Sequence, residues 1–200
     1  MDGMVCFVLD AIAEEVRACR LCPLWRGRRN AVPGEGNPRA ELMFIGEGPG
    51  EEEDLQGRPF VGRSGRLLTE ALEKAGIRRE DVFITNVVKC RPPENREPTP
   101  EERQTCTNKY LFRQIEAVNP RLIVLLGSVA VQTLLGISSV TAVRGKAFEK
   151  MGRRFFCTYH PAAALYNPGN RETFFSDIKK ARELLESLRP FDKQKTLFEV

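Results

Sequence analysis

The sequence predicts one α/β domain with a central four-stranded, mostly parallel sheet flanked by helices. The first observation is the length of 200 residues, which is typical of a single domain. The second is the alternation of short apolar runs with amphipathic segments. The third is the composition, with 42% hydrophobic and 29% charged residues, as in soluble globular proteins. We expect residues 1–190 to form this domain and residues 191–200 to form a C-terminal tail.

Four short apolar runs, each bounded by turn residues, predict the strands. They are LMFI (42–45), DVFITNVVKC (81–90), RLIVLLG (121–127) and RRFFCTYH (153–160). Parallel sheets bind ligands beyond the carboxyl ends of their strands. Asn86 and His160, the only histidine, belong to the segments that leave these ends, so we expect them at one rim.

Amphipathic segments and capping residues predict the helices. The first covers residues 5–19 and places one set of apolar side chains on one face, namely Val5, Val8, Leu9, Ile12 and Val16. Others cover residues 65–77, 128–136 and 173–188. A further helix begins after Thr99 as N-cap, with Pro100 at its first position and Glu102 as the capping-box partner.

Charge and hydropathy narrow the possible partners and the compartment. The net charge of +4 is compatible with nucleic-acid binding but is too small to predict it alone. No apolar run reaches the roughly 18 residues that cross a membrane. The N-terminal segment lacks the basic region and cleavage site of a signal peptide. We therefore expect a cytoplasmic protein.

The six cysteines are better explained as metal ligands or core residues than as disulfides in a reducing compartment. Four of them form a C-x-x-C pair and two positions that flank one proline-rich loop, namely Cys19, Cys22, Cys90 and Cys106. These four suit structural zinc or an iron–sulfur cluster, and spacing alone does not decide between them. Buried, inert cysteine is the alternative, and we assign Cys6 and Cys157 to the core.

The glycine-rich segment GEGPGEEED (46–54) follows the first strand. It is not a Walker A sequence, because no Gly-Lys-Ser/Thr follows. It also departs from G-x-G-x-x-G, since Glu51 occupies the third glycine position. Taken alone, it is compatible with an ordinary turn into a helix whose first turn is acidic.

Four motifs occur in order, namely GEGPGEEED, GRPFVGRSGRLL, TNVVKCRPPENREPTPEE and HPAAAL. Together with the upstream C-x-x-C, they resemble the family 4 uracil-DNA glycosylases, the iron–sulfur branch of that superfamily. The resemblance extends from Cys19 to the last helix. It implies a four-stranded parallel sheet, a 4Fe–4S cluster on Cys19, Cys22, Cys90 and Cys106, and removal of uracil from DNA by hydrolysis of its N-glycosidic bond. Such an enzyme would act in base excision repair, near the nucleoid.

The resemblance also implies roles for three side chains. Phe60 matches the aromatic residue that stacks on uracil. Asn86 matches the residue that reads the pyrimidine edge, where a carboxamide can meet O4 and N3–H together. His160 would donate a hydrogen bond to O2 as negative charge develops on the leaving base. The alternatives are a core phenylalanine, an asparagine that caps its own backbone, and a structural histidine.

The remaining motif residues are harder to assign. In the best-known branch of the superfamily this segment is G-Q-D-P-Y, and its aspartate positions the attacking water. Gly48 occupies that place here, so Glu47 is the candidate to position water or to stabilise the sugar cation. The backbone of Gly48 and Pro49 should line the pocket. Gly50 replaces the tyrosine that excludes thymine, which leaves thymine rejection open.

We also expect particular residues to contact DNA and a partner protein. Leu165 is the candidate wedge into the base stack. Six basic residues flank the motifs and could meet phosphates, namely Arg58, Arg63, Lys89, Arg91, Arg96 and Arg171. In the tail, Gln194, Leu197 and Phe198 resemble the clamp-binding peptide of repair proteins, although the second aromatic residue of that motif is missing. The alternative is a tail that folds back onto the domain.

Two other functions fit part of the pattern. One is a non-catalytic iron–sulfur module that binds nucleic acid, and the other is an electron carrier. The presence of Glu47, Phe60, Asn86 and His160 together favours the enzyme, because an electron carrier needs none of them. We expect a monomer, and the preference for single- or double-stranded DNA stays open.

Overall fold

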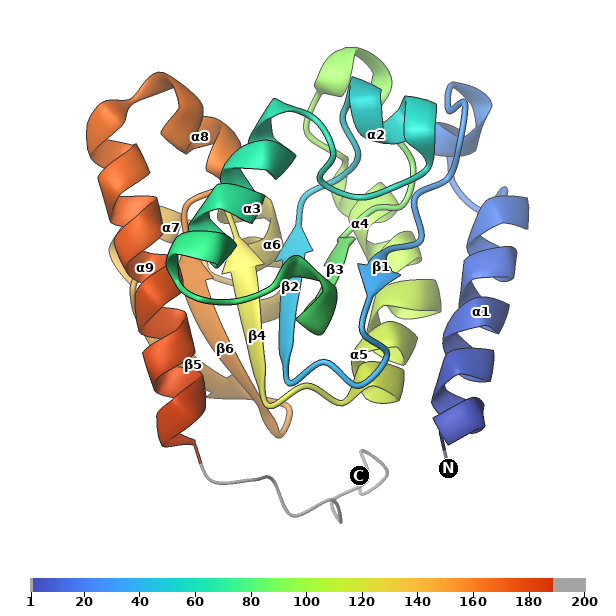
Figure 1. Ribbon diagram of the computed structural model, residues 1–200. Helices are drawn as coiled ribbons and strands as arrows, with labels where there is room; N and C mark the ends of the chain where they lie inside the picture. Colours follow the sequence, from blue (N-terminus) through green and yellow to red (C-terminus); the bar gives the residue numbers. More distant parts are fainter. Residues whose placement is uncertain (1, 189–200) are drawn as a thin grey trace.

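The structure is a computed structural model that describes residues 2–188. A six-stranded sheet with the order β1-β3-β2-β4-β6-β5 lies between two layers of helices (Figure 1). Its four central strands are parallel, namely β2 (Leu42–Gly46), β3 (Phe83–Asn86), β4 (Leu122–Leu126) and β6 (Arg153–Thr158). The predicted fold class and the four predicted strands are therefore confirmed.

Two short edge strands were not predicted from the sequence. β1 (Glu35–Gly36) pairs antiparallel with β3, and β5 (Ala147–Lys150) pairs antiparallel with β6. Most of their side chains are exposed, so neither strand has the apolar run that marks a buried one. Their pairing depends on a neighbouring strand rather than on a pattern of their own.

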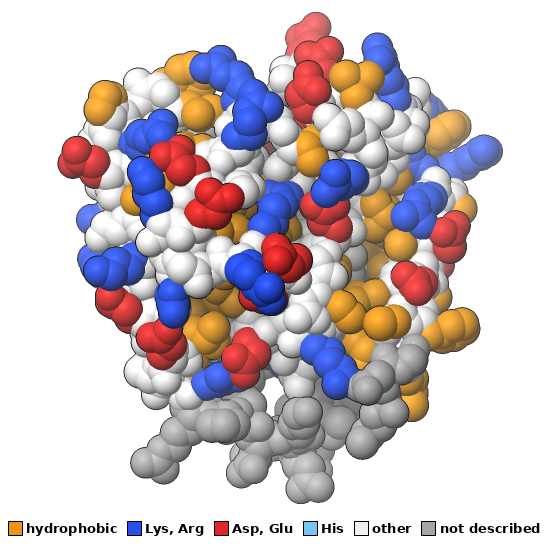
Figure 2. Space-filling model, in the orientation of Figure 1, with side chains coloured by type: hydrophobic (Ala, Val, Ile, Leu, Met, Phe, Trp, Pro, Cys, Tyr) orange, Lys and Arg blue, Asp and Glu red, His pale blue; other side chains and the backbone are white. Residues whose placement is uncertain are grey.

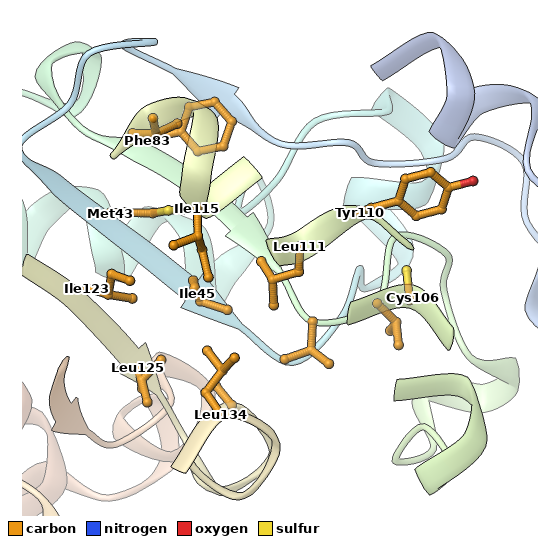
Figure 3. Packing of buried hydrophobic residues seen from close by; sticks show 14 of the residues in the cluster. Met43, Ile45, Phe83, Cys106, Tyr110, Leu111, Ile115, Ile123, Leu125 and Leu134 are labelled. Atoms are coloured by element: carbon orange, nitrogen blue, oxygen red, sulfur yellow. The ribbon is translucent and has the colours of Figure 1, made fainter. Parts of the chain in front are cut away.

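The first helical layer consists of α1 (Asp2–Ala18), α4 (Pro100–Cys106), α5 (Phe112–Val118), α6 (Ser128–Leu135) and the short α7 (Val140–Val143). A π-helical segment, Thr107–Leu111, joins α4 to α5. Figure 3 shows how this layer packs on the sheet, with Ile115 against Met43 and Ile45 and with Leu134 beside Leu125. Alternate residues of β2, Leu42 and Phe44, belong to the core on the other face, as the two-residue period of a strand requires.

The second layer consists of α3 (Arg63–Lys74), α8 (Pro161–Tyr166) and α9 (Pro168–Ser187), and the short α2 (Glu51–Gln56) lies at the carboxyl edge of the sheet. α9 begins five residues before the helix that the sequence predicts, and α8 was not predicted. Pro161 and Pro168 occupy the first positions of α8 and α9, where proline favours a helix. The Thr99–Glu102 capping box of α4 is confirmed.

The first half of α1 differs from the prediction. Ile12 and Val16 are buried, but Cys6 and Val8 are exposed, so assigning Cys6 to the core was wrong. The apolar face of α1 extends beyond the part of the helix that packs against other described residues. Phe7, in the uncovered half, is 74% exposed. Figure 2 shows hydrophobic side chains gathered along the side of the molecule where α1 lies. Cys157 lies in β6 and is buried, as predicted.

Residues 189–200, with Gln194, Leu197 and Phe198 of the predicted tail, lie outside the described residues. Within the described part, none of the helices combines the length and the apolar character needed to span a membrane.

Candidate active site

A cavity of about 420 Å³ opens at the carboxyl edge of the sheet. The residues predicted to bind the base all line it, namely Glu47, Gly48, Pro49, Phe60, Asn86 and His160, and Leu165 lines it as well. β2 and β3 end side by side there, with Gly46 in register with Asn86. The parallel arrangement of the strands brings these segments together, as the sequence predicted.

Asn86, the last residue of β3, points a polar group into this cavity. It is only 1% exposed, and its Oδ1 accepts no hydrogen bond from any described residue. Leaving a buried polar atom unpaired costs about 1–3 kcal/mol. A ligand that presents an N–H group at this point would remove that cost.

Gly46 allows two side chains of the site to meet. A Cβ atom at residue 46 would lie 2.5 Å from Cζ of Phe60 and 2.5 Å from Oδ1 of Asn86. Real Cβ contacts are not this short, so any other residue here would displace the ring or the carboxamide. The first glycine of the motif is therefore explained by close approach rather than by phosphate binding.

Phe60 has a left-handed backbone, with φ of +51°. For a residue with a Cβ atom this costs about 1–2 kcal/mol, so the surrounding structure must impose it. Oε1 of Glu53 accepts hydrogen bonds of 2.8 Å from the backbone N–H groups of Val61 and Gly62. On the other side, Gly65 lies so close that its Cβ would be 1.9 Å from the Phe60 carbonyl oxygen. These contacts hold the ring in the wall of the cavity.

His160 is the N-cap residue of α8. Its Nδ1 accepts a hydrogen bond of 3.2 Å from the backbone N–H of Ala162, so the proton of the neutral ring is on Nε2. Burial lowers the pKa of His160 to about 4, although the negative charge of Glu53 opposes this. At neutral pH the residue is therefore an uncharged Nε2–H donor. Its ring centroid lies 5.7 Å from that of Phe60.

Glu47 is a partly buried carboxyl group in the same wall. Burial raises its pKa, the Glu97 carboxylate raises it further, and Arg103 opposes the shift. A raised carboxyl pKa suits a group that exchanges a proton or orients water near neutral pH.

The structure adds residues that the sequence analysis missed. Glu53, Ser64, Asn95 and Tyr166 also line the cavity. Glu53 could have been found from its position three residues after Gly50, where a glutamate often caps a helix; its Oε2 accepts from Gly50 N at 3.1 Å. Asn95 lies in the proline-rich part of the third motif, and Tyr166 directly follows Leu165, so both belong to segments that the motifs already mark.

The six basic residues expected to meet phosphates differ in their surroundings. Lys89 is 1% exposed, so this expectation was wrong for it. Four of the arginines are engaged with polar neighbours, namely Arg58 with Glu35, Arg91 with Asn95, Arg96 with Glu102 and Arg171 with Glu70. Arg63 lines the cavity, and its guanidinium lies 5.7 Å from the ring of Tyr166.

The four cysteines of the predicted metal site line a second, small cavity together with Lys89 and Tyr110. Cys90 and Cys106 are buried, and Cys19 and Cys22 are partly exposed. Arg28 donates a hydrogen bond of 3.0 Å to the sulfur of Cys90. Cys157 is not part of this set, and burial raises the pKa of its thiol to about 12, as expected of an inert core cysteine.

Comparisons with known proteins agree with this geometry. Residues 33–186 match the family model described as the uracil DNA glycosylase superfamily. The chain is 48% identical to the type-4 uracil-DNA glycosylase of Archaeoglobus fulgidus, over 96% of this chain and 98% of the relative. It is 51% identical to the type-4 enzyme of Saccharolobus solfataricus, over 90% and 87%, and 48% identical to that of Thermotoga maritima, over 90% and 95%.

Proposed function

The chain belongs to the uracil-DNA glycosylase superfamily, as a type-4 enzyme that removes uracil from DNA in base excision repair, and we propose that the 420 Å³ cavity is the site of this reaction. The observation that carries the proposal is the unpaired, buried Oδ1 of Asn86. It faces the same cavity as the ring of Phe60 and the neutral imidazole of His160.

Asn86 and Phe60 would select the base. The Asn86 carboxamide would accept from N3–H of uracil and donate to O4, which satisfies Oδ1. Cytosine presents the opposite pattern and would leave buried polar groups mismatched. Phe60 would stack on the flipped base, which contributes roughly 1–3 kcal/mol and offsets part of the cost of extrusion.

His160 would stabilise the leaving group. When the bond between C1′ and N1 breaks, the electron pair stays on uracil and negative charge spreads to O2. Nε2–H of His160 is the donor available to that oxygen, because Nδ1 is already engaged by Ala162. One preorganised donor of this kind contributes about 2.7–4 kcal/mol to the transition state. The water oxygen bonds to C1′, and its proton leaves to the solvent or to the departing base.

Glu47 is the residue we assign to the water or to the sugar cation. Its carboxyl group lines the cavity beside the backbone of Gly48 and Pro49. Gly48 has no side chain to take this role, so the carboxylate next to it is the nearest candidate. Its negative charge would also stabilise the positive charge that develops on the sugar.

We assign a 4Fe–4S cluster to Cys19, Cys22, Cys90 and Cys106. All four thiols line one cavity. Among the described residues, no group of three or more possible ligands is close enough to hold a single metal ion. A cluster spreads its four thiolates over several irons, so this spacing fits it. When bound, the cluster would join the end of α1, the segment after β3 and the end of α4.

Two partner interactions are also proposed. The end of α8 would enter the DNA beside the flipped base, with Leu165 or the more exposed Tyr166 as the wedge. Gln194, Leu197 and Phe198 would bind a sliding clamp with micromolar affinity, on the order of −8 kcal/mol. We also propose that the enzyme acts as a monomer.

The decisive experiment incubates the purified protein with an oligonucleotide that contains one uracil, followed by alkali. We expect strand breakage at the uracil and none at cytosine or thymine. His160→Ala and Asn86→Ala are the matched variants, and both should lose most of the breakage. Binding of the oligonucleotide without breakage would instead favour a non-catalytic module. For the clamp, truncation after residue 193 should abolish clamp binding in calorimetric titration and leave uracil excision unchanged.

A further inference from the structure

Lys89 is a buried cation between the cysteine site and the base-binding cavity. It is 1% exposed and lies between Val88 and Cys90, three residues after Asn86. Within the described residues, the hydrogen bonds of its ammonium group go to a hydroxyl, a backbone carbonyl and a carboxamide, and none goes to a carboxylate. Long charged side chains are rarely buried without a partner, so its position requires a specific explanation.

The ammonium group of Lys89 has three hydrogen-bond acceptors, which matches its three N–H donors. Nζ donates to Oγ1 of Thr85 at 2.6 Å, to the backbone carbonyl of Asn86 at 2.7 Å and to Oε1 of Gln114 at 2.6 Å. The side chain therefore folds back onto the end of its own strand. It holds the peptide group of Asn86, whose Oδ1 lies in the base cavity.

These acceptors are themselves fixed. Thr85 Oγ1 donates to the carbonyl of Pro33 at 2.9 Å, and Gln114 Nε2 donates to the same carbonyl at 2.7 Å. Both side chains therefore present oxygen to Lys89, and the amide of Gln114 has one orientation that fits. A saturated network of this kind has little freedom to rearrange.

The other side of Lys89 faces the cysteines. It lines the small cavity that the four thiols share. Its backbone N–H donates to the sulfur of Cys106, and Lys89 directly precedes Cys90 in the chain. Its backbone carbonyl accepts from Val32 N at 2.8 Å. One residue thus contacts the thiolate site and the strand end that carries Asn86.

We propose that Lys89 is a positioning residue that supplies the positive charge beside the cysteine-bound group and, through the Asn86 carbonyl, holds the carboxamide that recognises uracil. This inference rests on the proposed iron–sulfur site and on the proposed role of Asn86. It links the two sites: a change in charge at Lys89 alters the cysteine site, and loss of its hydrogen bond alters base recognition.

Two substitutions separate these effects in the full-length, iron-loaded protein. Lys89→Met keeps most of the length of the side chain but removes the positive charge and every N–H donor. Lys89→Gln removes the charge and keeps two N–H donors on a side chain that is one bond shorter. Lys109→Met, an exposed lysine in the π-helical segment, is the matched control. The measurements are the midpoint potential of the cluster by film voltammetry and the affinity for free uracil by calorimetry.

In Lys89→Met we expect a more negative midpoint potential, because the more negative reduced cluster loses a nearby cation. We also expect uracil affinity to fall by roughly tenfold, the scale of one lost charge-assisted hydrogen bond. Lys89→Gln should show the shifted potential with affinity closer to the parent. The control should change neither quantity.

Unchanged uracil affinity in folded Lys89→Met overturns the link to base recognition, and an unchanged potential overturns the charge role. If Lys89→Met does not fold, the charge role is tested with Lys89→Gln alone. A midpoint potential equal to that of the parent in Lys89→Gln contradicts the proposal. Two other results would contradict the assignments on which this inference rests. Absence of iron from the parent protein would contradict the cluster assignment, and a parental uracil affinity in Asn86→Ala would contradict the role of Asn86.

Discussion

Gly46 and Phe60 are in such close contact that one added methyl group at residue 46 would lie 2.5 Å from the tip of the ring. The ring cannot move away easily, because the backbone of residue 60 is fixed by Glu53 and by Gly65. The shape of the cavity at the carboxyl edge of the sheet therefore depends on a glycine at the end of one strand and on an aromatic residue from a loop between two helices.

This contact predicts the effect of Gly46→Ala. The methyl group should displace Phe60 or Asn86 by about 1 Å, and misplacement on this scale costs roughly 10²-fold in rate. Single-turnover excision from a uracil oligonucleotide measures it. Gly152→Ala is the control, because no atom lies within 4 Å of a Cβ there, although its φ of +64° will cost some stability. A rate near the parental value in Gly46→Ala would show that the cavity tolerates the displacement.

His160→Ala should slow single-turnover excision by roughly 10²–10³-fold, the scale of one lost transition-state donor. Substrate binding should change less than the rate, because the hydrogen bond strengthens only as charge develops on uracil. The measurement is the rate at saturating enzyme together with the concentration of enzyme that gives half of it. Near-normal turnover would exclude His160 as the donor.

The pH dependence follows from the same residue. Burial lowers the pKa of His160 to about 4, so the neutral donor persists well below the usual value of about 6.5. We expect the acid limb due to this group near pH 4 in single-turnover rates. The unfolded state binds the extra proton between these two values, so the contribution of His160 to the free energy of unfolding falls as pH drops through that window. An acid limb centred near pH 6.5 that disappears in His160→Ala would contradict the burial of this ring.

Glu53→Gln should lower the affinity of the cavity for uracil, although the substitution keeps the shape of the side chain. The two carboxylate oxygens accept three backbone N–H groups, and a carboxamide must turn its NH₂ toward at least one of them. An unpaired buried donor costs about 1–3 kcal/mol, which corresponds to roughly 10- to 100-fold in uracil affinity if Phe60 moves. Glu73→Gln, an exposed glutamate of α3 that does not line the cavity, should match the parent. Equal uracil affinity in the two variants would exclude this role for Glu53.

The two wedge candidates at the end of α8 can be separated by substrate. Tyr166 is 76% exposed, whereas Leu165 is partly buried against the core. Tyr166→Ala should slow excision from double-stranded DNA, where a vacated stack must be filled, and leave single-stranded DNA unaffected. Leu165→Ala should affect both substrates, because its side chain also packs against the core beneath the cavity. The ratio of the two rates is the readout, and the reverse pattern would identify Leu165 as the wedge.

The iron–sulfur assignment predicts that protein purified without added metal holds about four irons and four sulfides per chain. Removal of the iron should mainly destabilise the segment after Cys90, which can be followed by limited proteolysis. Cys157→Ser is the control, because this cysteine lies in the core away from the other four and should leave the iron content unchanged. Stoichiometric zinc in the native protein would contradict the assignment.

Much of the fold and most of the site could be predicted from the sequence, because they depend on local patterns. β2 and β4 are continuous apolar runs, and the Thr99–Glu102 cap needs only residues three positions apart. Asn86 and His160 follow strand ends, so the parallel arrangement alone brings them to one edge. None of these inferences requires knowledge of a distant partner.

Tertiary structure decided the features that depend on distant contacts. The edge strands β1 and β5 have no apolar pattern and exist through their neighbours. Lys89 resembles a surface cation in sequence, but Gln114 and Thr85 provide the acceptors that allow its burial. Phe60 adopts a left-handed backbone because Glu53 and Gly65 impose it, whereas Cys6 is exposed because no described element covers the start of α1. In each case the outcome depends on whether another segment supplies a contact at that position, and the pattern of the segment itself carries no information about this.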